Sequence, residues 1–472
     1  LHLSIRRQRQ MCIRDSVIVV PMTSWLSQQF GRRNYFAASI IIFTVSSFLC
    51  GNATTLWEII LFRFIQGLGG GALLVTSQTI ITESYPPEKR GLAQAIYGMG
   101  VIVGPTLGPP LGGYIIDNWS WPYIFYINIP IGIIAVLLTI SFVRSPKYAE
   151  KSKLSQVDFL GIILLAIAVG SLQYVLEHGQ QDDWFSDSTI VTLSIASFFG
   201  FILFVWRELV FKHPIVNLRV LKDSNLAVGT ILSFILGFGL YGSTFIIPIY
   251  TQSILGWTAT DAGLLLIPSS LMTAFMMPII ATMLQKGVPP KYMVAGGFFI
   301  FFCYSFWSYK ILTPDTGSEH FFWPLIVRGV GLGLLFVPVT TLSLSSLTGQ
   351  QIGEGAAFTG MMRQLGGSFG IAIITTFISR WTVGHRTNLV SHLDTSDFDV
   401  QKHIQNLQMS FISKGFAPNE ALNKAYNLLD LQVTKQATVL TYMDVFLYLG
   451  VVFLICICLL YTSPSPRDRQ KS

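Results

Sequence analysis

Long apolar stretches alternate with short polar segments along almost the whole chain. Each stretch holds about 20 mostly apolar residues, enough for an α-helix to cross a hydrocarbon core about 30 Å thick. None shows the strict alternation of polar and apolar positions that a membrane-spanning β-strand requires. The pattern predicts twelve full spans, at residues 34–54, 57–81, 92–116, 123–143, 158–178, 188–211, 226–251, 262–285, 292–312, 322–346, 357–380 and 438–457. A further apolar segment, 17–30, is too short to cross and resembles the end of a helix whose start is missing.

Composition supports a membrane protein. Apolar residues make up 51% of the 472 positions and charged residues 12%, against roughly 25% charged in a soluble domain. Five cysteines are present without metal-ligand spacing, so neither a metal site nor a disulfide framework is expected. No phosphate-binding loop or nucleophile constellation occurs. We therefore expect no catalytic residue, no cofactor and no enzyme activity.

Lysine and arginine occupy every second connecting segment. The basic residues of these segments are Arg32, Arg33, Lys89, Arg90, Arg144, Lys147, Lys151, Lys153, Arg207, Lys212, Arg219, Lys222, Lys286 and Lys291. The intervening short segments hold none. Because short cytoplasmic loops retain Lys and Arg, the basic segments face the cytoplasm. The net charge of +7 therefore reflects the basic residues that set the orientation in the membrane, and no nucleic-acid partner is expected.

The two ends differ from the rest of the chain. Residues 1–16 and 458–472 are polar and basic, and Met11 to Ser16 and Cys458 to Ser463 can be encoded by opposite strands of one DNA sequence. Both ends resemble translated sequencing-library adapters; the alternative is a natural basic tail at each end. On the adapter interpretation the chain is a fragment, its first complete helix is missing, and neither end is a targeting signal.

The remaining chain divides into two similar halves. Arg63 opens the glycine-rich run RFIQGLGGGALLVTSQTI, and Arg328 opens RGVGLGLLFVPVTTLSL. Duplicated six-helix halves are typical of many secondary transporters. Adding one lost helix to the spans gives fourteen: six, a linker pair and six. We therefore expect an all-α polytopic fold with an N-terminal half at 17–143, a two-helix linker at 144–225 and a C-terminal half at 226–457.

The C-terminal half contains a long outer segment, 381–437. The runs HIQNLQMSFISKGF and NEALNKAYNLLDLQ within it have the periodicity of two amphipathic helices. The segment either docks a partner or is a solvated loop.

The run GMGVIVGPTLGPPLGG lies within an apolar span and combines glycine with proline. Its glycines recur every four residues and form one face without side chains, so a neighbouring helix backbone is able to pack against it. Neighbouring helices also lower the cost of the prolines by satisfying the freed carbonyls. The alternative is ordinary helix-dimer packing. The residues of this motif are Gly100, Gly104, Pro105, Gly108, Pro109 and Gly112.

This motif resembles the antiporter motif of the major facilitator superfamily. Arg63, Gln66, Gly67 and Gly69 match its fourth-helix motif, and SWPYIFYINIPIG at 120–132 is similar to its sixth-helix entry, although Pro122 replaces the usual basic residue. The loop motif of the fourteen-helix EmrB/QacA-like drug:proton antiporters is matched by Pro21, Trp25, Leu26, Phe30, Gly31, Arg32 and Arg33. The resemblance covers about 17–457. It implies a multi-pass protein of the bacterial plasma membrane, linked to antibiotic resistance.

The resemblance also assigns roles. It implies that Arg63 tunes a proton-carrying acid; the alternative is an arginine that reaches the outer surface. Arg328 and Arg363 face the same choice, and Gln66 and Gln364 either bind a ligand or bridge helices. Arg32 and Arg33 form either a conformational latch or a plain positive-inside anchor. An unpaired charge inside a span costs at least about 2.5–3.5 kcal/mol.

Proton coupling requires a group that titrates within the membrane. No carboxylate lies mid-membrane in the first half, because Glu58, Glu83 and Asp117 are near its faces. Asp444 is the one candidate elsewhere; the alternative is a solvated acid at a helix end. The family's usual acid lies on the first helix, so the site is expected to have been lost with that helix.

We therefore expect a secondary transporter that exports small amphipathic organic compounds in exchange for protons by alternating access. Its cavity is lined partly by the fourth, fifth, twelfth and thirteenth helices. Alternatives are a non-transporting receptor or scaffold, or a solute importer of the same fold. In a cell with two membranes, the resemblance implies a periplasmic adaptor and an outer-membrane channel as partners.

Overall fold

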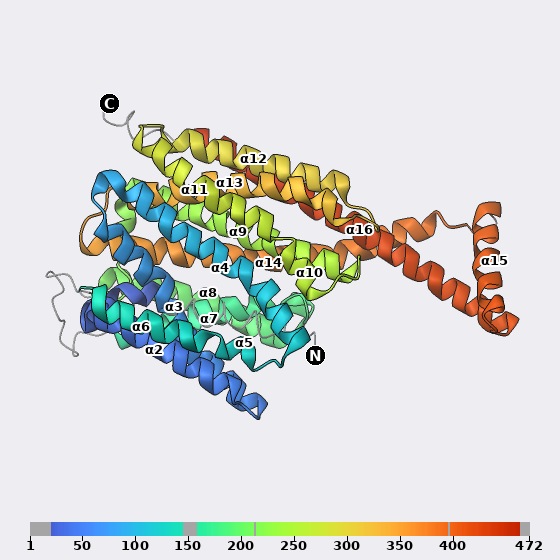
Figure 1. Cartoon of the computed structure of the whole chain (residues 1–472), viewed down its shortest axis with the longest axis horizontal. Coiled ribbons are helices and arrows are strands. Elements are labelled where there is room, and N and C mark those ends of the chain that lie inside the picture. The colour runs from blue at the N-terminus through green and yellow to red at the C-terminus, as the bar shows by residue number, and fades with distance from the viewer. Residues whose placement is uncertain (1–19, 145–157, 212–213, 395–396, 463–472) are drawn as a thin grey trace.

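The computed structural model describes residues 20–144, 158–211, 214–394 and 397–462, and these residues contain helices and no strand (Figure 1). Residues 20–30 are helical. The elements that follow are α2 (Arg32–Gly51), α3 (Leu56–Ser84), η1 (Pro87–Lys89), α4 (Arg90–Asn118), α5 (Tyr123–Tyr126), α6 (Asn128–Phe142), α7 (Phe159–His178), η3 (Trp184–Ser186), α8 (Ser188–Val210), η4 (Leu218–Lys222), α9 (Ser224–Ser253), α10 (Ala259–Leu264), α11 (Ile267–Gln285), α12 (Pro290–Ile311), α13 (Ser318–Leu344), α14 (Gln350–Ser391), α15 (Phe398–Ser413) and α16 (Pro418–Thr462). The adapter-like residues 1–16, most of the basic loop 144–157 and residues 463–472 lie outside the described ranges.

The helices coincide with the predicted spans. Within the described ranges, eleven helices are long and apolar enough to cross a membrane, and each matches one predicted span. The twelfth predicted span, 92–116, lies in α4, a helix of 29 residues. The all-α polytopic fold class is therefore confirmed.

Polar side chains at the membrane faces start several helices. Thr55 and Glu58 form a reciprocal capping box on α3, and Asp158 accepts a hydrogen bond from the N–H of Gly161 at the start of α7. Asp187 caps α8, and hydrogen bonds from the backbone of Ile190 and from Thr189 lower its pKa. Such caps satisfy N–H groups that the helix itself leaves without partners. They fix where the chain enters the bilayer.

We refer to residues 20–142 as the N-terminal half, to α7 and α8 as the linker pair, and to α9–α16 as the C-terminal half. Within the N-terminal half, α2 packs against α3 and α6. Helix α4 packs mainly against α10, α11 and α13 of the other half, and it runs beside them across the bundle in Figure 1. Helix α4 is therefore the main element that joins the halves.

The largest apolar core lies in the C-terminal half and includes α4. Its buried side chains include Phe298, Phe301, Phe336 and Tyr442, together with Tyr97 of α4. A second core joins the linker pair to α14 and to the helix at 20–30. Ser197 of α8 donates a hydrogen bond to the carbonyl of Ala168 in α7 at 2.9 Å. The linker pair thus forms a compact unit against α14.

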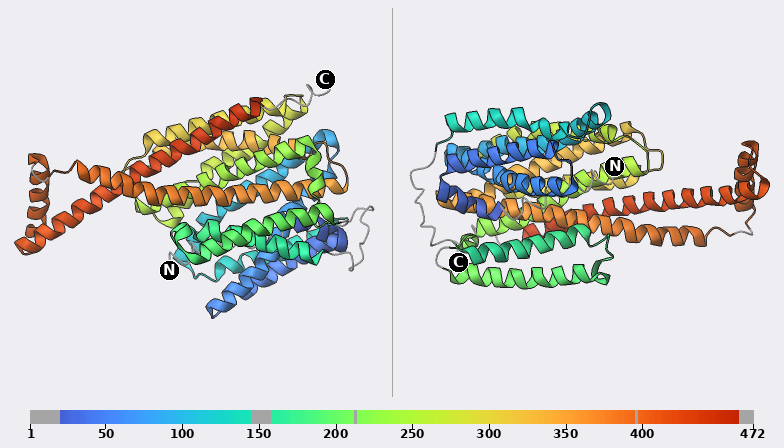
Figure 2. Two further views of the ribbon diagram at one scale, coloured as in Figure 1. Left: turned by 180° about the vertical axis from the view of Figure 1, so that it is seen from behind. Right: turned by 90° about the horizontal axis from the view of Figure 1, so that it is seen from below.

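The outer segment forms a helical hairpin beyond the bundle, which we define as residues 380–437. Helices α14 and α16 have 42 and 45 residues, so each extends over more than 60 Å at about 1.5 Å per residue. Both continue past the ends of their neighbours and carry α15 at the tip (Figure 2). Arg386 of α14 pairs with Asp430 of α16 and holds the two helices together.

The prediction for this segment is correct in part. The run at 403–416 lies largely in a separate helix, α15. The prediction of a second separate helix is wrong, because the run at 419–432 is continuous with the last span in α16. Glycine and proline are absent from 419–449, so nothing interrupts that helix.

Alternation of the basic loops predicts sidedness that cysteine labelling will test. In a background without native cysteines, single cysteines at the exposed positions Lys89 and Lys286 are expected to react with a membrane-impermeant maleimide only after permeabilisation. Cysteines at Gln181 and Asn388, also exposed, are expected to react from outside in intact cells. Labelling of all four positions from the same side would contradict the topology.

Candidate functional site

Helix α4 is anchored to the C-terminal half at its N-terminal end, which the basic loops predict to be cytoplasmic. Nη1 of Arg90 donates hydrogen bonds to the carbonyls of Leu344 and Leu347, both at 3.1 Å. These carbonyls lie at the end of α13, where the helix dipole favours a cation. Arg90 therefore locks the two halves together at the end that the basic loops predict to be cytoplasmic.

The same helix contacts the C-terminal half at two further depths. A methyl group on Gly98 would lie 2.7 Å from the ring of Phe336, and one on Gly113 would lie 2.7 Å from the hydroxyl of Thr260. Glycine at these positions permits an approach that a larger residue would prevent. The halves are thus in contact at the cytoplasmic end, in the middle and near the outer end of α4.

The predicted packing of the four-residue glycine stripe is wrong. A methyl group on Gly100, Gly104 or Gly112 would meet no described atom within 4 Å, and Gly108 is exposed. Steps of four residues drift by about 40° around a helix, and the face that packs carries Gly98 and Gly113 instead. The α4 backbone continues as a helix through Pro105 and Pro109. A role of the motif in transport stays a prediction.

Arg363 lies at the junction of the halves. Its side chain projects from α14, with the residue 4% exposed, and its Nη2 donates a hydrogen bond to the hydroxyl of Tyr97 on α4 at 3.4 Å. Its guanidinium carbon lies 5.0 Å from the ring centre of Phe336 on α13. Nη1 has no hydrogen-bond partner in the structure. This cation is therefore only partly compensated.

Arg63 and Gln66 lie together on α3 within the N-terminal half. The guanidinium of Arg63 lies over the ring of Phe125 at 4.6 Å, and its Nη1 is 3.4 Å from Oε1 of Gln66. Gln66 is buried and donates a hydrogen bond to Ser47 of α2. Gln66 thus bridges two helices, and Arg63 gains a cation–π contact.

Arg328 occupies the corresponding position in α13. It is 3% exposed and donates hydrogen bonds to Ser243 and Ser269, both at 2.9 Å, and to Thr244. Neutral hydroxyl groups therefore disperse this charge within the C-terminal half.

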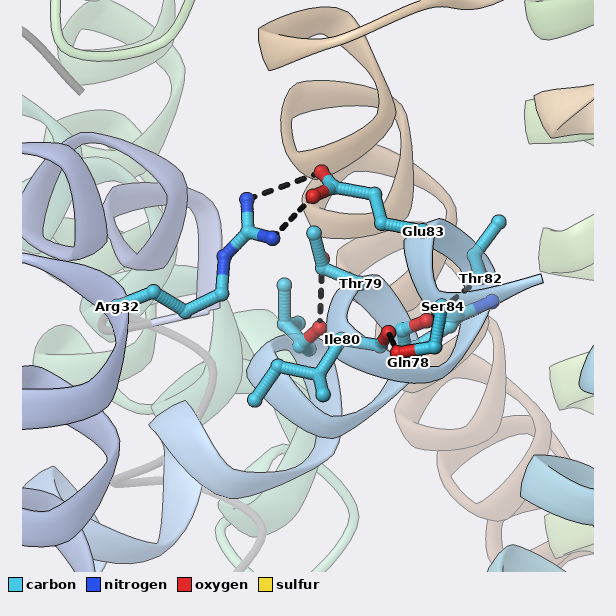
Figure 3. Close-up of polar contacts among 8 residues, drawn as sticks. Arg32, Gln78, Thr79, Ile80, Thr82, Glu83 and Ser84 are labelled. Atoms are coloured by element: carbon cyan, nitrogen blue, oxygen red, sulfur yellow. Dashed lines mark hydrogen bonds and ion pairs between the residues drawn. The ribbon is translucent and has the colours of Figure 1, made fainter. Parts of the chain in front are cut away.

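The loop motif forms a tight turn with an ion pair. Gly31 has a φ of 80°, a conformation that favours glycine, and it separates the helix at 20–30 from α2. Arg32 pairs in a bidentate manner with Glu83 near the end of α3 (Figure 3). This contact joins two helices of the same half. Pro21 is buried, Trp25 packs in the second core and Arg33 is exposed; a latch role stays a prediction.

Buried amides connect α3 to α4. Nε2 of Gln78 donates to Gln94 at 3.0 Å, and Gln94 donates to Thr82 at 2.7 Å; Gln78 and Thr82 are drawn in Figure 3. The sequence shows that each glutamine lies within an apolar span, which indicates a buried polar contact. The spacing of the residues does not show which side chain on the other helix is the partner.

Asp444 of α16 pairs with His385 of α14. Nε2 of His385 lies 2.8 Å from the carboxylate, and both side chains are about a quarter exposed. The acid lies where the bundle meets the hairpin, and it is in contact with a histidine rather than with Arg63 or Arg363. Its role in proton coupling stays a prediction.

The structure brings some predicted residues together and separates others. Arg63 meets Gln66, but Arg363 and Asp444 belong to other environments. Sequence reasoning missed Arg90, Tyr97, Phe336 and His385 as contacts. Among the described residues, no group of three or more His, Cys, Asp or Glu side chains is arranged to hold a metal ion.

The fold and the paired halves define a membrane transporter. A family model described as Major Facilitator Superfamily matches residues 16–371. The chain therefore belongs to the major facilitator superfamily, in its branch of EmrB-like drug:proton antiporters. It is 32% identical to the fatty acid resistance protein FarB of Neisseria gonorrhoeae, over 96% of this chain and 87% of FarB. It is 30% identical to the multidrug export protein EmrB of Escherichia coli K12, over 96% of this chain and 86% of EmrB.

Solved structures share the fold. The human organic anion transporter MFSD10 superimposes with a TM-score of 0.58 at 13% identity, over 94% of this chain and 82% of that chain. The proton:xylose symporter XylE superimposes with a TM-score of 0.55 at 16% identity, over 79% of each chain. Both likenesses concern the arrangement of helices.

Replacement of Arg90 by alanine is expected to favour opening of the cytoplasmic side, because the carbonyls at the end of α13 lose their cation. Spin labels at Glu88 and Thr348 will report the separation of the halves by pulsed electron resonance. We expect the population of long distances to rise about 10- to 100-fold, the size of a lost charge-assisted hydrogen bond. Alanine at the exposed neighbour Lys89 is the control. Identical distance distributions in R90A and the wild type would refute the lock.

Proposed function

We propose that this protein exports amphipathic organic compounds across the bacterial plasma membrane in exchange for protons. The observation that carries the proposal is similarity over 96% of the chain to proteins named for multidrug export and for fatty acid resistance. Apolar and aromatic side chains with a few buried polar groups lie where the halves meet, and separation of the halves would expose a lining that suits amphipathic cargo.

The contacts of α4 support alternating access. The Arg90 contact closes the cytoplasmic side, and the approach of Gly113 to Thr260 joins the halves near the outer side. Between them lie Tyr97 and Phe336, whose ring centres are 6.2 Å apart. Rocking of the halves would break one end contact at a time, and the region of these rings would then face one compartment.

Proton coupling has two candidates in the described chain. Asp444 is held by His385 at 2.8 Å and is the acid we propose to titrate. Arg63, placed over Phe125, is proposed to tune a proton-carrying acid, as the family resemblance implies. For either role, an acid has to gain and lose a proton during the transport cycle; a structural contact alone is not enough.

Transport driven by an imposed pH gradient will test the function. In proteoliposomes containing the full-length protein, a fluorescent amphipathic compound is expected to move against the direction of proton flow, and reversal of the gradient is expected to reverse its movement. Protein-free liposomes are the control for passive diffusion. Movement in the same direction as protons would favour an importer. Gradient-independent binding without movement would favour a receptor or scaffold and would refute the proposal.

We further propose that the outer hairpin docks a periplasmic adaptor that leads to an outer-membrane channel. The hairpin extends beyond the bundle (Figure 2) and exposes large apolar side chains. Val383, Phe398, Met409 and Leu431 are each at least 65% exposed. Apolar groups in this number on an aqueous surface are typical of protein-binding sites.

Removal of the hairpin tip will separate docking from transport. Replacement of residues 392–417 by a short Gly/Ser linker is expected to abolish resistance in cells with two membranes, while transport in proteoliposomes stays within about twofold of the wild type. The matched control substitutes serine for Ile404, which is buried in the hairpin, and should affect stability rather than docking. Full resistance of the tip-deleted protein would contradict the docking proposal.

A further inference from the structure

We propose that Arg363 binds the carboxylate of anionic amphipathic substrates and that Phe336 and Tyr97 accommodate the adjoining part of the same molecules. This inference rests on the proposed export function and specifies one substrate class: compounds with a single carboxylate and an apolar body. The juxtaposition that supports it is a buried, incompletely paired guanidinium next to the ring of Phe336 and the hydroxyl of Tyr97, at the boundary of the halves.

The charge of Arg363 is incompletely compensated. The residue is 4% exposed, and Nη1 has no hydrogen-bond partner. Within the described ranges no carboxylate lies within 4.0 Å of its guanidinium. A buried cation in this state is destabilising, because it has lost water without gaining a counter-charge. A ligand carboxylate would supply both the charge and the missing acceptor.

Other buried arginines show that the chain can satisfy such a charge internally. Arg328 engages three hydroxyl groups within its own half. Arg32 has a bidentate carboxylate partner in Glu83. Arg363, by comparison, makes one hydrogen bond of 3.4 Å. Of these three arginines, Arg363 therefore has the fewest hydrogen bonds in the structure.

The position of Arg363 makes it available during the transport cycle. Its hydrogen bond to Tyr97 crosses from α14 to α4, whereas Phe336 belongs to the same half as Arg363. Separation of the halves would remove the Tyr97 hydroxyl and leave more of the guanidinium without partners. Arginine presents a planar fork that matches a carboxylate in a bidentate manner.

The surroundings suit the rest of an amphipathic molecule. The ring of Phe336 adjoins the guanidinium, and the ring of Tyr97 lies 6.2 Å from it between ring centres. Met277 and Val101 belong to the same buried cluster. Gly98 lets the ring of Phe336 pack directly against the α4 backbone, so this ring lies at the junction that opens when the halves separate. An apolar body next to the charged head would therefore contact rings and aliphatic groups rather than water.

Three matched probes will test the charge preference: 2-naphthylacetate, 2-(2-naphthyl)ethanol and 2-(2-naphthyl)ethylamine. Their binding to the full-length protein in lipid nanodiscs is measured by fluorescence titration. The wild type is expected to bind the anion most tightly. R363Q is expected to lose about 10- to 100-fold of the affinity for the anion, the size of a charge-assisted hydrogen bond, and to bind the alcohol within about twofold of the wild type.

Two further variants keep the test decisive. R363K retains the charge without the fork and is expected to keep an intermediate affinity for the anion, even if R363Q fails to fold. R386Q removes a positive charge from the outer part of the same helix, where Arg386 pairs with Asp430, and is expected to leave all three affinities unchanged.

Two outcomes would overturn the proposal. One is unchanged affinity of R363Q for the anion. The other is an equal loss for all three probes, which would mark Arg363 as structural or as part of proton coupling. Proton-driven movement of the cationic probe is measured separately in proteoliposomes, so export can hold while the carboxylate site fails.

Discussion

The low dielectric of the bilayer governs this structure, because every charge taken out of water has to be compensated within the bundle. The constraint is strictest for arginine, because its guanidinium stays protonated at any ordinary pH and cannot become neutral. The chain meets the requirement in several ways: an aromatic face beneath Arg63, hydroxyl groups around Arg328 and a carboxylate against Arg32. Arg363 alone of these has a contact that depends on how the halves are placed.

Because the contact of Arg363 depends on the placement of the halves, α4, which carries Tyr97, has a central role in the structure. Although it belongs in sequence to the N-terminal half, α4 contributes Tyr97 to the core of the C-terminal half and reaches the end of α13 through Arg90. Its close approaches use Gly98 and Gly113, which lie on a different face from the four-residue stripe. The joint between the halves is therefore a single helix held at several depths. Polar contacts lie at its cytoplasmic end and near its centre, and apolar packing lies between them.

Hydropathy alone was enough for the spans, because about 20 apolar residues in lipid have to form a helix. The sequence motifs were enough to identify the protein family. Contacts between distant segments were not predictable: glycine spacing indicated a smooth face but not whether a neighbour lies against it, and Arg363 was recognised without Tyr97 or Phe336. Spacing reports which residues share one helix face, whereas pairing across helices depends on tilt and rotation that a single sequence does not encode. The continuity of α16 was not predictable from polarity, because a helix is able to pass from an apolar to a polar environment without a break.

The length of α14 has a mechanical consequence. One uninterrupted helix carries Arg363 in the middle of the bundle and ends at Ser391 in the outer hairpin, roughly 40 Å further along at 1.5 Å per residue. A tilt of about 5° around the depth of Arg363 would displace the far end by about 3.5 Å over that length. Helix α14 is therefore a rigid lever that converts a small rearrangement deep in the membrane into a visible movement outside it.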